Sequence, residues 1–259
     1  MIQENYENIK EWFNNHSISF SGDDAHVQMN IDLKREHSLK TSEIIKDLGQ
    51  SENLIESDLL LAECIALLHD VGRFTQLAQY GTFSDSKEVN HANMGVTILE
   101  EEQILKHLDE EEQNIILKAI GMHNMAKLPK IQDKNLLFFT EILRDADKLD
   151  IYRIVSEHYC SKKINPNKML ELDLPEKPDI SKKVYNCIIG EKVVNIENVM
   201  TLNDFKLMHM SWVYDMHLKR SYQIVNEKSY LKKIFDTLPK TDEVIDMYRN
   251  MKIYMENKL

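Results

Sequence analysis

The sequence predicts an all-α protein. Seven glycines and five prolines are few for 259 residues, and 29% of the residues are charged, which favours helices over strands joined by tight turns. Apolar residues also recur at spacings of three and four along much of the chain, as they do on one face of an α-helix. We therefore expect a bundle of several helices, with an accessory helical part in the C-terminal third.

The first helix of the core is expected over residues 24–48, with Gly49 as its end. Its apolar stripe consists of Leu33, His37, Ile44 and Leu48, so His37 should point inward. Ser57 can cap the next helix, in which residues 59–68 are apolar on nearly every side, as expected of a central helix. That helix leads directly into the adjacent pair His69 and Asp70.

Residues 72–90 lose the helical period and carry many polar groups, which predicts a loop of functional length. A helix should follow to about residue 105, with Asn90 as its cap and His91 in its first turn. Asp109 and Glu112 have the spacing of a capping box and predict the start of another helix. The stripe of that helix is Ile116, Ala119 and Ile120, and it leads to His123.

Residues 133–159 predict a long helix. Its buried stripe consists of Leu136, Leu143, Asp147, Ile151 and Ile154, at spacings of three, four and seven. Asp147 should therefore face inward, whereas Asp145, rotated by about 200° around the helix axis, should lie nearer the opposite face.

The stretch 161–180 contains Pro166, Pro175 and Pro178 among many charges, which predicts an exposed connection or lid. Beyond it we expect a short helix near 180–189, a break at Gly190, a short extended piece at 193–196, an amphipathic stretch at 203–237 and a final helix after Thr241. These features divide the chain into an N-terminal helical extension (1–23), a helical core (24–160) and an accessory C-terminal helical region packed on the core (161–259).

Composition excludes some classes of function. A formal net charge of −11 argues against broad binding to DNA or RNA, which needs a dense basic surface. The three cysteines have no paired spacing, which favours reduced thiols in the cytoplasm. The N-terminal residues do not resemble a signal peptide, and no apolar segment approaches the roughly 20 residues that span a bilayer. We expect a cytoplasmic protein that does not contact a membrane, and its sequence is compatible with a homo-oligomer.

Metal-binding side chains occur at the ends or on the buried stripes of five successive predicted helices. They are His37, His69 with Asp70, His91, His123 and Asp147. Each alone has a structural explanation, since a core histidine can donate to a backbone carbonyl and an inward aspartate can form an ion pair. Together they are what a helical bundle needs to converge ligands on one central site.

This pattern resembles the HD-domain superfamily of metal-dependent phosphohydrolases, in which a histidine, a His-Asp pair and an aspartate follow in this order. The resemblance rests on His37, on His69-Asp70 within residues 67–74, and on Asp147 within residues 145–150, and it covers about residues 24–160. It implies that these four residues bind one divalent metal. His91 and His123 look like the histidines that members with two metals add, although many of those members have two adjacent histidines where this chain has His123 and Asn124.

A site of mixed nitrogen and oxygen ligands suits Mn²⁺, Fe²⁺, Co²⁺, Ni²⁺ or Zn²⁺ better than Ca²⁺, as one ion or as two. With two ions about 3.5 to 4 Å apart, Asp70 would bridge them. Phosphate needs further cations, for which Arg73 offers a two-pronged guanidinium and Lys148 a point charge. We expect Asp70, Arg73 and Lys148 to be the catalytic residues.

These features predict a phosphohydrolase that uses metal-activated water to cleave a phosphoester of a nucleotide or another small phosphorylated metabolite. Two alternatives stay open. One is a hydrolase of a signalling nucleotide, such as a cyclic dinucleotide or a guanosine polyphosphate, although no Gly-Tyr-Pro tripeptide follows the His-Asp pair. The other is a non-enzymatic protein that binds metal or ligand and regulates a partner.

Overall fold

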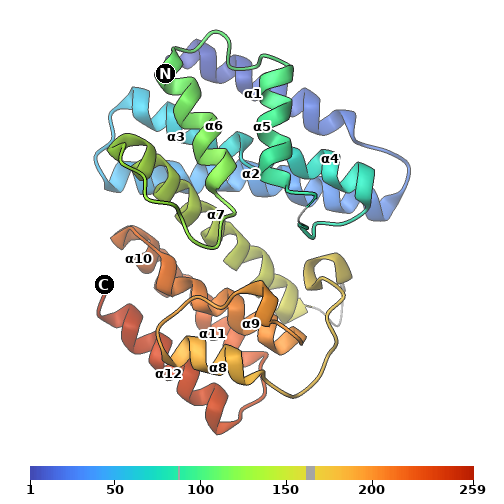
Figure 1. The fold of residues 1–259 in the computed structure, drawn as a ribbon, viewed down its shortest axis with the longest axis vertical. Coiled ribbons are helices and arrows are strands. Elements are labelled where there is room, and N and C mark those ends of the chain that lie inside the picture. Colours follow the sequence, from blue (N-terminus) through green and yellow to red (C-terminus); the bar gives the residue numbers. More distant parts are fainter. Residues whose placement is uncertain (87, 162–166) are drawn as a thin grey trace. The chain divides into compact units, whose positions relative to one another are not determined.

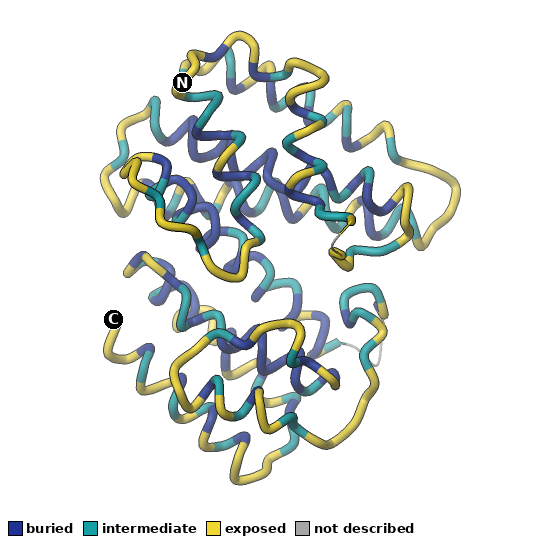
Figure 2. Tube along the Cα trace, in the orientation of Figure 1, coloured by how far each residue is buried: buried dark blue, intermediate teal, exposed yellow. Residues whose placement is uncertain are grey.

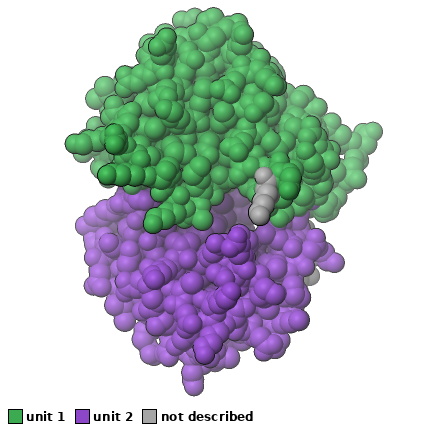
Figure 3. All heavy atoms as spheres, viewed as in Figure 1, with its two compact units in different colours: residues 1–150 green, residues 151–259 purple. Residues whose placement is uncertain are grey.

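The computed structural model of the chain describes residues 1–86, 88–161 and 167–259. It consists of helices α1 to α12 and the short 3-10 helices η1 to η3, without a strand in the described ranges (Figure 1). The prediction of an all-α fold is confirmed. The chain divides into two compact units, Met1–Asp150 and Ile151–Leu259, and the boundary between them falls within α7 (Figure 3).

Unit 1 is built around α3. Its elements are α1 (Gln3–Ser19), α2 (Ala25–Ser51), α3 (Glu56–Leu68), α4 (Val71–Tyr80), α5 (His91–Glu101), α6 (Glu110–Met122) and the first part of α7 (Lys134–Ser161). Every residue from Leu59 to Leu68 is buried, and α3 packs against α1, α2 and α6 (Figure 2). Residues 1–23, expected as an extension, supply α1, which buries Phe13 and packs on α3 and α4.

Two expected helix boundaries are wrong. Gly49 does not end α2, which continues to Ser51. A Cβ at Gly49 would lie 2.8 Å from the Leu59 side chain, so this glycine permits close packing of α2 on α3 instead of stopping the helix. Ser57 is not the cap of α3 but lies in its first turn, since Ile55 precedes the helix.

The expected loop at residues 72–90 is also partly wrong, because residues Val71–Tyr80 form α4. Val71, Phe74 and Leu77 recur at every third position and are buried on one face of this helix. Gly81, at a φ of 64°, ends the helix in the left-handed conformation that favours glycine. The connection to α5 therefore begins at Gly81, and Lys87 within it lies outside the described residues.

The other helices of unit 1 follow the expected starts. The side chains of Asn90 and Asp109 cap α5 and α6 by accepting hydrogen bonds from backbone N–H groups, although α5 ends at Glu101 instead of residue 105. The long helix expected at 133–159 is α7. Asp145, expected nearer the face opposite Asp147, is fully buried, so this part of α7 is covered on several sides.

Unit 2 contains the end of α7, η1 (Lys168–Glu171), α8 (Lys182–Ile189), η2 (Ile196–Asn198), α9 (Leu202–Ser211), η3 (Trp212–Asp215), α10 (Lys219–Glu227), α11 (Tyr230–Asp236) and α12 (Asp242–Glu256). The short helix before Gly190 and the final helix after Thr241 are confirmed. The expected connection at 161–180 contains residues 162–166, which lie outside the described residues. No helix in the described ranges is both long and apolar enough to cross a bilayer.

The amphipathic stretch expected at 203–237 is not one helix but several short ones, and residues 193–196 do not form a strand. A straight helix would place Val213 and Tyr222 about 180° apart, yet both are buried. The breaks between α9, η3 and α10 let each side chain reach the interior. His209 on α9 is buried between the rings of Phe205 and Trp212, with ring centroids 4.3 and 4.7 Å away.

Candidate metal centre

The junction of α3 and α4 places two polar residues inside unit 1. His69 directly follows α3 and Asp70 directly precedes α4, so both side chains leave the chain where one helix ends and the next begins. His37, in the middle of α2, faces them, and its Nε2 atom is 3.2 Å from Nε2 of His69. All three side chains are buried, and buried polar groups cost free energy unless they have partners.

Gly72 brings the start of α5 against this junction. A Cβ at Gly72 would lie 2.1 Å from the carbonyl oxygen of His91 and 2.7 Å from the backbone nitrogen of Gly95, so no larger residue fits. The close approach of the two backbones carries His91 into the cluster. Its Nε2 atom lies 3.3 Å from Oδ1 of Asp70.

His123 and Asp147 complete the cluster from α6 and α7. Nε2 of His123, at the end of α6, is 3.0 Å from Nε2 of His91. Oδ1 of Asp147, on α7, is 3.1 Å from Nε2 of His37 and 3.6 Å from Nε2 of His69. The structure thus brings together all six residues that the sequence suggested as metal ligands.

Each of the four histidines uses its Nδ1 atom outside the cluster. The partners of Nδ1 are Asp150 Oδ2 for His37 (2.8 Å), the Ala66 carbonyl for His69 (2.6 Å), Asp85 Oδ2 for His91 (2.7 Å) and the Ile120 carbonyl for His123 (2.7 Å). Carbonyl and ionised carboxylate oxygens only accept, so each Nδ1 donates its hydrogen, and the Nε2 atom of each ring points into the cluster. Metal-binding histidines in proteins are oriented by the same kind of outer hydrogen bond.

The distances between the inward atoms suit a common cation. When ligand atoms lie about 2.0 to 2.1 Å from one ion, two of them at right or tetrahedral angles are about 2.8 to 3.4 Å apart. The Nε2 atoms of the His37 and His69 pair and of the His91 and His123 pair are 3.2 and 3.0 Å apart. Three overlapping groups of residues in the described ranges could hold a metal ion: His37 with His69 and Asp70, His69 with His123 and Asp147, and Asp70 with His91 and His123.

Asp70 offers one oxygen to each side of the cluster. Its Oδ2 atom lies 3.6 Å from Nε2 of His37 and 3.7 Å from Nε2 of His69. Its Oδ1 atom faces the other two histidines, at 3.3 Å from Nε2 of His91 and 4.0 Å from Nε2 of His123. A carboxylate placed in this way can bridge two cations.

Burial keeps two of the rings neutral. Desolvation, and then the charges of His91 and His69, lower the pKa of His123 to about 3, and desolvation likewise lowers the pKa of His91. Neither ring therefore carries a second proton near neutral pH, so the Nε2 lone pairs of His91 and His123 face each other at 3.0 Å. Two lone pairs at this distance repel each other, and a cation between them removes the repulsion.

The other side of the cluster attracts positive charge. Burial acts to raise the pKa of Asp70 and of Asp147. For Asp70 the surrounding positive charges together, Lys34 first among them, outweigh burial and hold the pKa well below its usual range. For Asp147 the hydrogen bonds with His37 and His69 and the charges of those rings together do the same. Burial and Lys34 act to lower the pKa of His37, yet its hydrogen bonds with Asp147 and Asp150 raise that pKa above its ordinary value. Two ionised carboxylates thus lie among the four imidazoles.

Of the two expected catalytic cations, Arg73 contacts a cluster residue, and Lys148 follows one in the sequence. Nε of Arg73 is 3.5 Å from Oδ1 of Asp70, but its Nη1 donates to Oε1 of Gln76 at 2.8 Å and to the carbonyl oxygen of Phe83 at 2.6 Å. Arg73 therefore holds the connection after α4 as well as facing Asp70. Lys148 is buried on α7, directly after Asp147.

The sequence interpretation missed three residues that contact the cluster: Lys34, Asp85 and Asp150. Nζ of Lys34 lies 2.7 Å from Oδ2 of Asp70. Lys34 is three residues before His37, and Asp150 three residues after Asp147, so helical spacing could have indicated both.

No helical spacing connects Asp85 to a ligand, because it lies in the connection before α5. Its carboxylate accepts hydrogen bonds from the side chains of His91, Gln76 (3.0 Å) and Asn124 (3.2 Å). Asn124 occupies the position where many two-metal members of the HD-domain superfamily have a second histidine. In this chain it donates to Asp85, the residue that orients His91.

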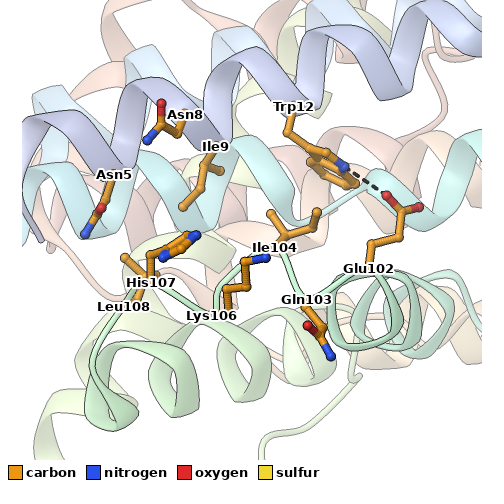
Figure 4. A pocket seen from close by; sticks show the side chains of 10 residues that line it. All are labelled: Asn5, Asn8, Ile9, Trp12, Glu102, Gln103, Ile104, Lys106, His107 and Leu108. Atoms are coloured by element: carbon orange, nitrogen blue, oxygen red, sulfur yellow. Dashed lines mark hydrogen bonds between the residues drawn. The ribbon is translucent and has the colours of Figure 1, made fainter.

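A surface pocket of about 190 Å³ lies elsewhere in unit 1, between α1 and the segment that follows α5 (Figure 4). The indole nitrogen of Trp12 donates to Oε2 of Glu102 across it at 2.9 Å. The remaining lining residues are Asn5, Asn8, Ile9, Gln103, Ile104, Lys106, His107 and Leu108. None of the six cluster residues lines this pocket, so the two are separate features.

Comparison with known protein families matches residues 35–172, just over half of the chain, to the family described as HD domain. The matched range contains His37, the His69-Asp70 pair and Asp147. No curated protein and no solved structure matches the chain.

Proposed function

Because the chain belongs to the HD domain family, we propose that it is a metal-dependent phosphohydrolase that cleaves a phosphoester of a nucleotide or another small phosphorylated metabolite. The observation that carries the proposal is the arrangement of Asp70, with one oxygen toward each pair of inward-pointing imidazoles. We propose that His37, His69, Asp70 and Asp147 hold one divalent transition metal, and that Asp70, His91 and His123 hold a second.

Bound divalent ions polarise a phosphoryl oxygen and lower the pKa of a water molecule, which can then attack phosphorus. The residues of the chain supply the rest. Asp85 and Asp150 keep the Nε2 atoms of His91 and His37 directed inward, and the Ala66 and Ile120 carbonyls do the same for His69 and His123. Arg73 brings positive charge to Asp70, where it would favour an anionic substrate, and we propose that Lys148, the residue after Asp147, adds a second charge.

A small phosphorylated substrate fits the charge of the protein better than a nucleic acid polymer does. With a formal net charge of −11, the surface as a whole repels a long polyanion, whereas a few local cations suffice for one phosphate group. The two cations that lie against Asp70, Lys34 and Arg73, are such a local group.

The test is phosphate release by protein loaded with Mn²⁺, Co²⁺ or Ni²⁺, measured over phosphomonoesters, phosphodiesters and a broad panel of nucleotides. We expect metal-dependent hydrolysis of at least one class and its loss in His69→Ala. His26→Ala is the matched control, because His26 lies on α2 but its side chain is exposed and outside the cluster. Absence of hydrolysis by the loaded protein, or equal activity of His69→Ala, would overturn the proposal. Tight metal binding without any hydrolysis would favour a regulatory protein instead.

A further inference from the structure

Lys34 contacts the cluster directly, and the family resemblance assigns this residue no role. Its Nζ atom lies 2.7 Å from Oδ2 of Asp70, and the ring of Phe83 lies beneath the ammonium group at 5.4 Å. Lys34 is three residues before His37 on α2, so the helix directs both side chains to the same place. Its side chain is 15% exposed, which means that a ligand from solvent can reach it.

Two neighbouring arginines are held by the protein itself. Nη1 of Arg73 donates to the Phe83 carbonyl and to Gln76, and Nη1 of Arg144 donates to the carbonyl oxygen of His123 at 2.8 Å. These contacts fix the segments around the cluster. Lys34, in contrast, uses its ammonium group on an oxygen that is itself a candidate metal ligand.

The contact between Lys34 and Asp70 places a positive charge beside a candidate metal ligand. Oδ2 of Asp70 is the oxygen that faces His37 and His69, so Lys34 and a divalent ion held by these residues would share that oxygen. The ammonium group and the ion have the same sign of charge, so Lys34 would weaken metal binding. Lysine carries its charge on a flexible four-carbon stem, so Nζ can move without displacing α2.

We propose that Lys34 binds the phosphoryl group of the substrate: its ammonium group, held beside Asp70, pairs with a phosphoryl oxygen of a substrate that reaches the cluster. This inference rests on the proposed function and names the residue through which the same site recognises phosphate. The positive charge of Lys34 would weaken metal binding and strengthen phosphate binding, so the two affinities depend on Lys34 in opposite directions.

Lys34→Met separates these two effects, because it keeps the length of the stem and removes the charge. Without the competing ammonium group, Mn²⁺ should bind about 10-fold more tightly. Inorganic phosphate, measured as a competitive inhibitor or by calorimetry on the Mn²⁺-loaded protein, should bind roughly 10- to 100-fold more weakly, since one charge-assisted hydrogen bond is lost. Lys34→Arg should keep phosphate binding near that of the unsubstituted protein.

Lys40→Met is the matched control. Lys40 lies six residues further along α2 and pairs with Glu43, with 44% of its side chain exposed, so neither affinity should change. A merely structural role of Lys34 would lower both affinities together, and that result would overturn the inference. So would equal affinities in Lys34→Met and the unsubstituted protein, provided that the latter binds metal and phosphate. If the unsubstituted protein binds no phosphate and hydrolyses nothing when loaded with metal, the proposed function itself fails.

Discussion

Gly72→Ala tests how the fold positions the candidate metal centre. A Cβ at this position would lie 2.1 Å from the carbonyl oxygen of His91 and 2.7 Å from the backbone nitrogen of Gly95. Both contacts are to backbone atoms, which cannot rotate away as the end of a side chain can. The start of α4 and the start of α5 must therefore separate by about 1 Å to reach an ordinary contact distance.

This displacement is large compared with the tolerance of a metal site. The atoms Nε2 of His91 and Oδ1 of Asp70 are 3.3 Å apart and belong to the two segments that must separate. We expect the half of the site formed with His123 to lose its metal, and a misplacement of about 1 Å to lower the rate of hydrolysis by about 100-fold. Overpacking should also lower the free energy of unfolding by about 1 to 3 kcal/mol.

The assay combines elemental analysis of the purified variant with its hydrolysis rate and its thermal unfolding. Gly121→Ala is the control, because Gly121 lies within α6 close to His123 but its added Cβ would meet only Val96, at an ordinary 3.7 Å. Alanine should favour that helix and leave metal content unchanged. If Gly72→Ala bound as much metal as the unsubstituted protein and hydrolysed at the same rate, the close approach of α4 and α5 could not be what positions His91.

Three further predictions follow from contacts and burial. Asp85→Ala removes the acceptor of the His91 Nδ1 hydrogen. Calorimetry should then show the weaker of the two metal equivalents binding about 10- to 100-fold less tightly. An unchanged metal affinity would contradict the role of Asp85 in orienting His91. Removing metal with a chelator should lower the midpoint temperature of thermal unfolding, and adding Mn²⁺ should restore it, because an ion at 100 times its Kd stabilises the folded state by about 2.7 kcal/mol. If the chelator left this midpoint unchanged, the result would argue against a bound metal. Desolvation lowers the pKa of His209 from its ordinary 6.5 to about 3. Between these two values the unfolded chain binds a proton at His209 and the folded chain does not. The free energy of unfolding therefore falls as the pH drops below 6.5. Between pH 6.5 and 4.5, denaturant titrations should show that the free energy of unfolding decreases by about 2 kcal/mol less in His209→Gln than in the unsubstituted protein. Identical pH profiles of the two proteins would show that His209 does not cause the decrease.

The sequence predicts the cluster well because its ligands follow the local geometry of helices. His37 and Asp147 lie on apolar stripes, and His69 and His123 come directly after apolar helices, so periodicity alone directs them inward. The capping side chain of Asn90 similarly fixes the start of α5 one residue before His91.

The sequence predicts poorly where tertiary packing decides. The polar residues of α4 suggested a loop, but Arg73 and Gln76 find partners in the connection that follows, so the helix can form. Asp85 gave no signal, because its partners come from α4, α5 and the end of α6, which only the fold brings together. Asp145 lies two residues from Asp147 and is nonetheless fully buried, because periodicity cannot tell how many sides of α7 are covered.

The central claim is that six residues from five helices and their junctions hold divalent transition metal. The most direct test is elemental analysis of protein purified without added metal, performed on the unsubstituted chain, on Asp70→Ala and on His26→Ala. The account predicts two equivalents of transition metal per chain, a loss of both in Asp70→Ala because Asp70 faces both halves of the cluster, and no change in His26→Ala. A chain that holds no transition metal, or an Asp70→Ala variant that keeps two equivalents, would contradict it.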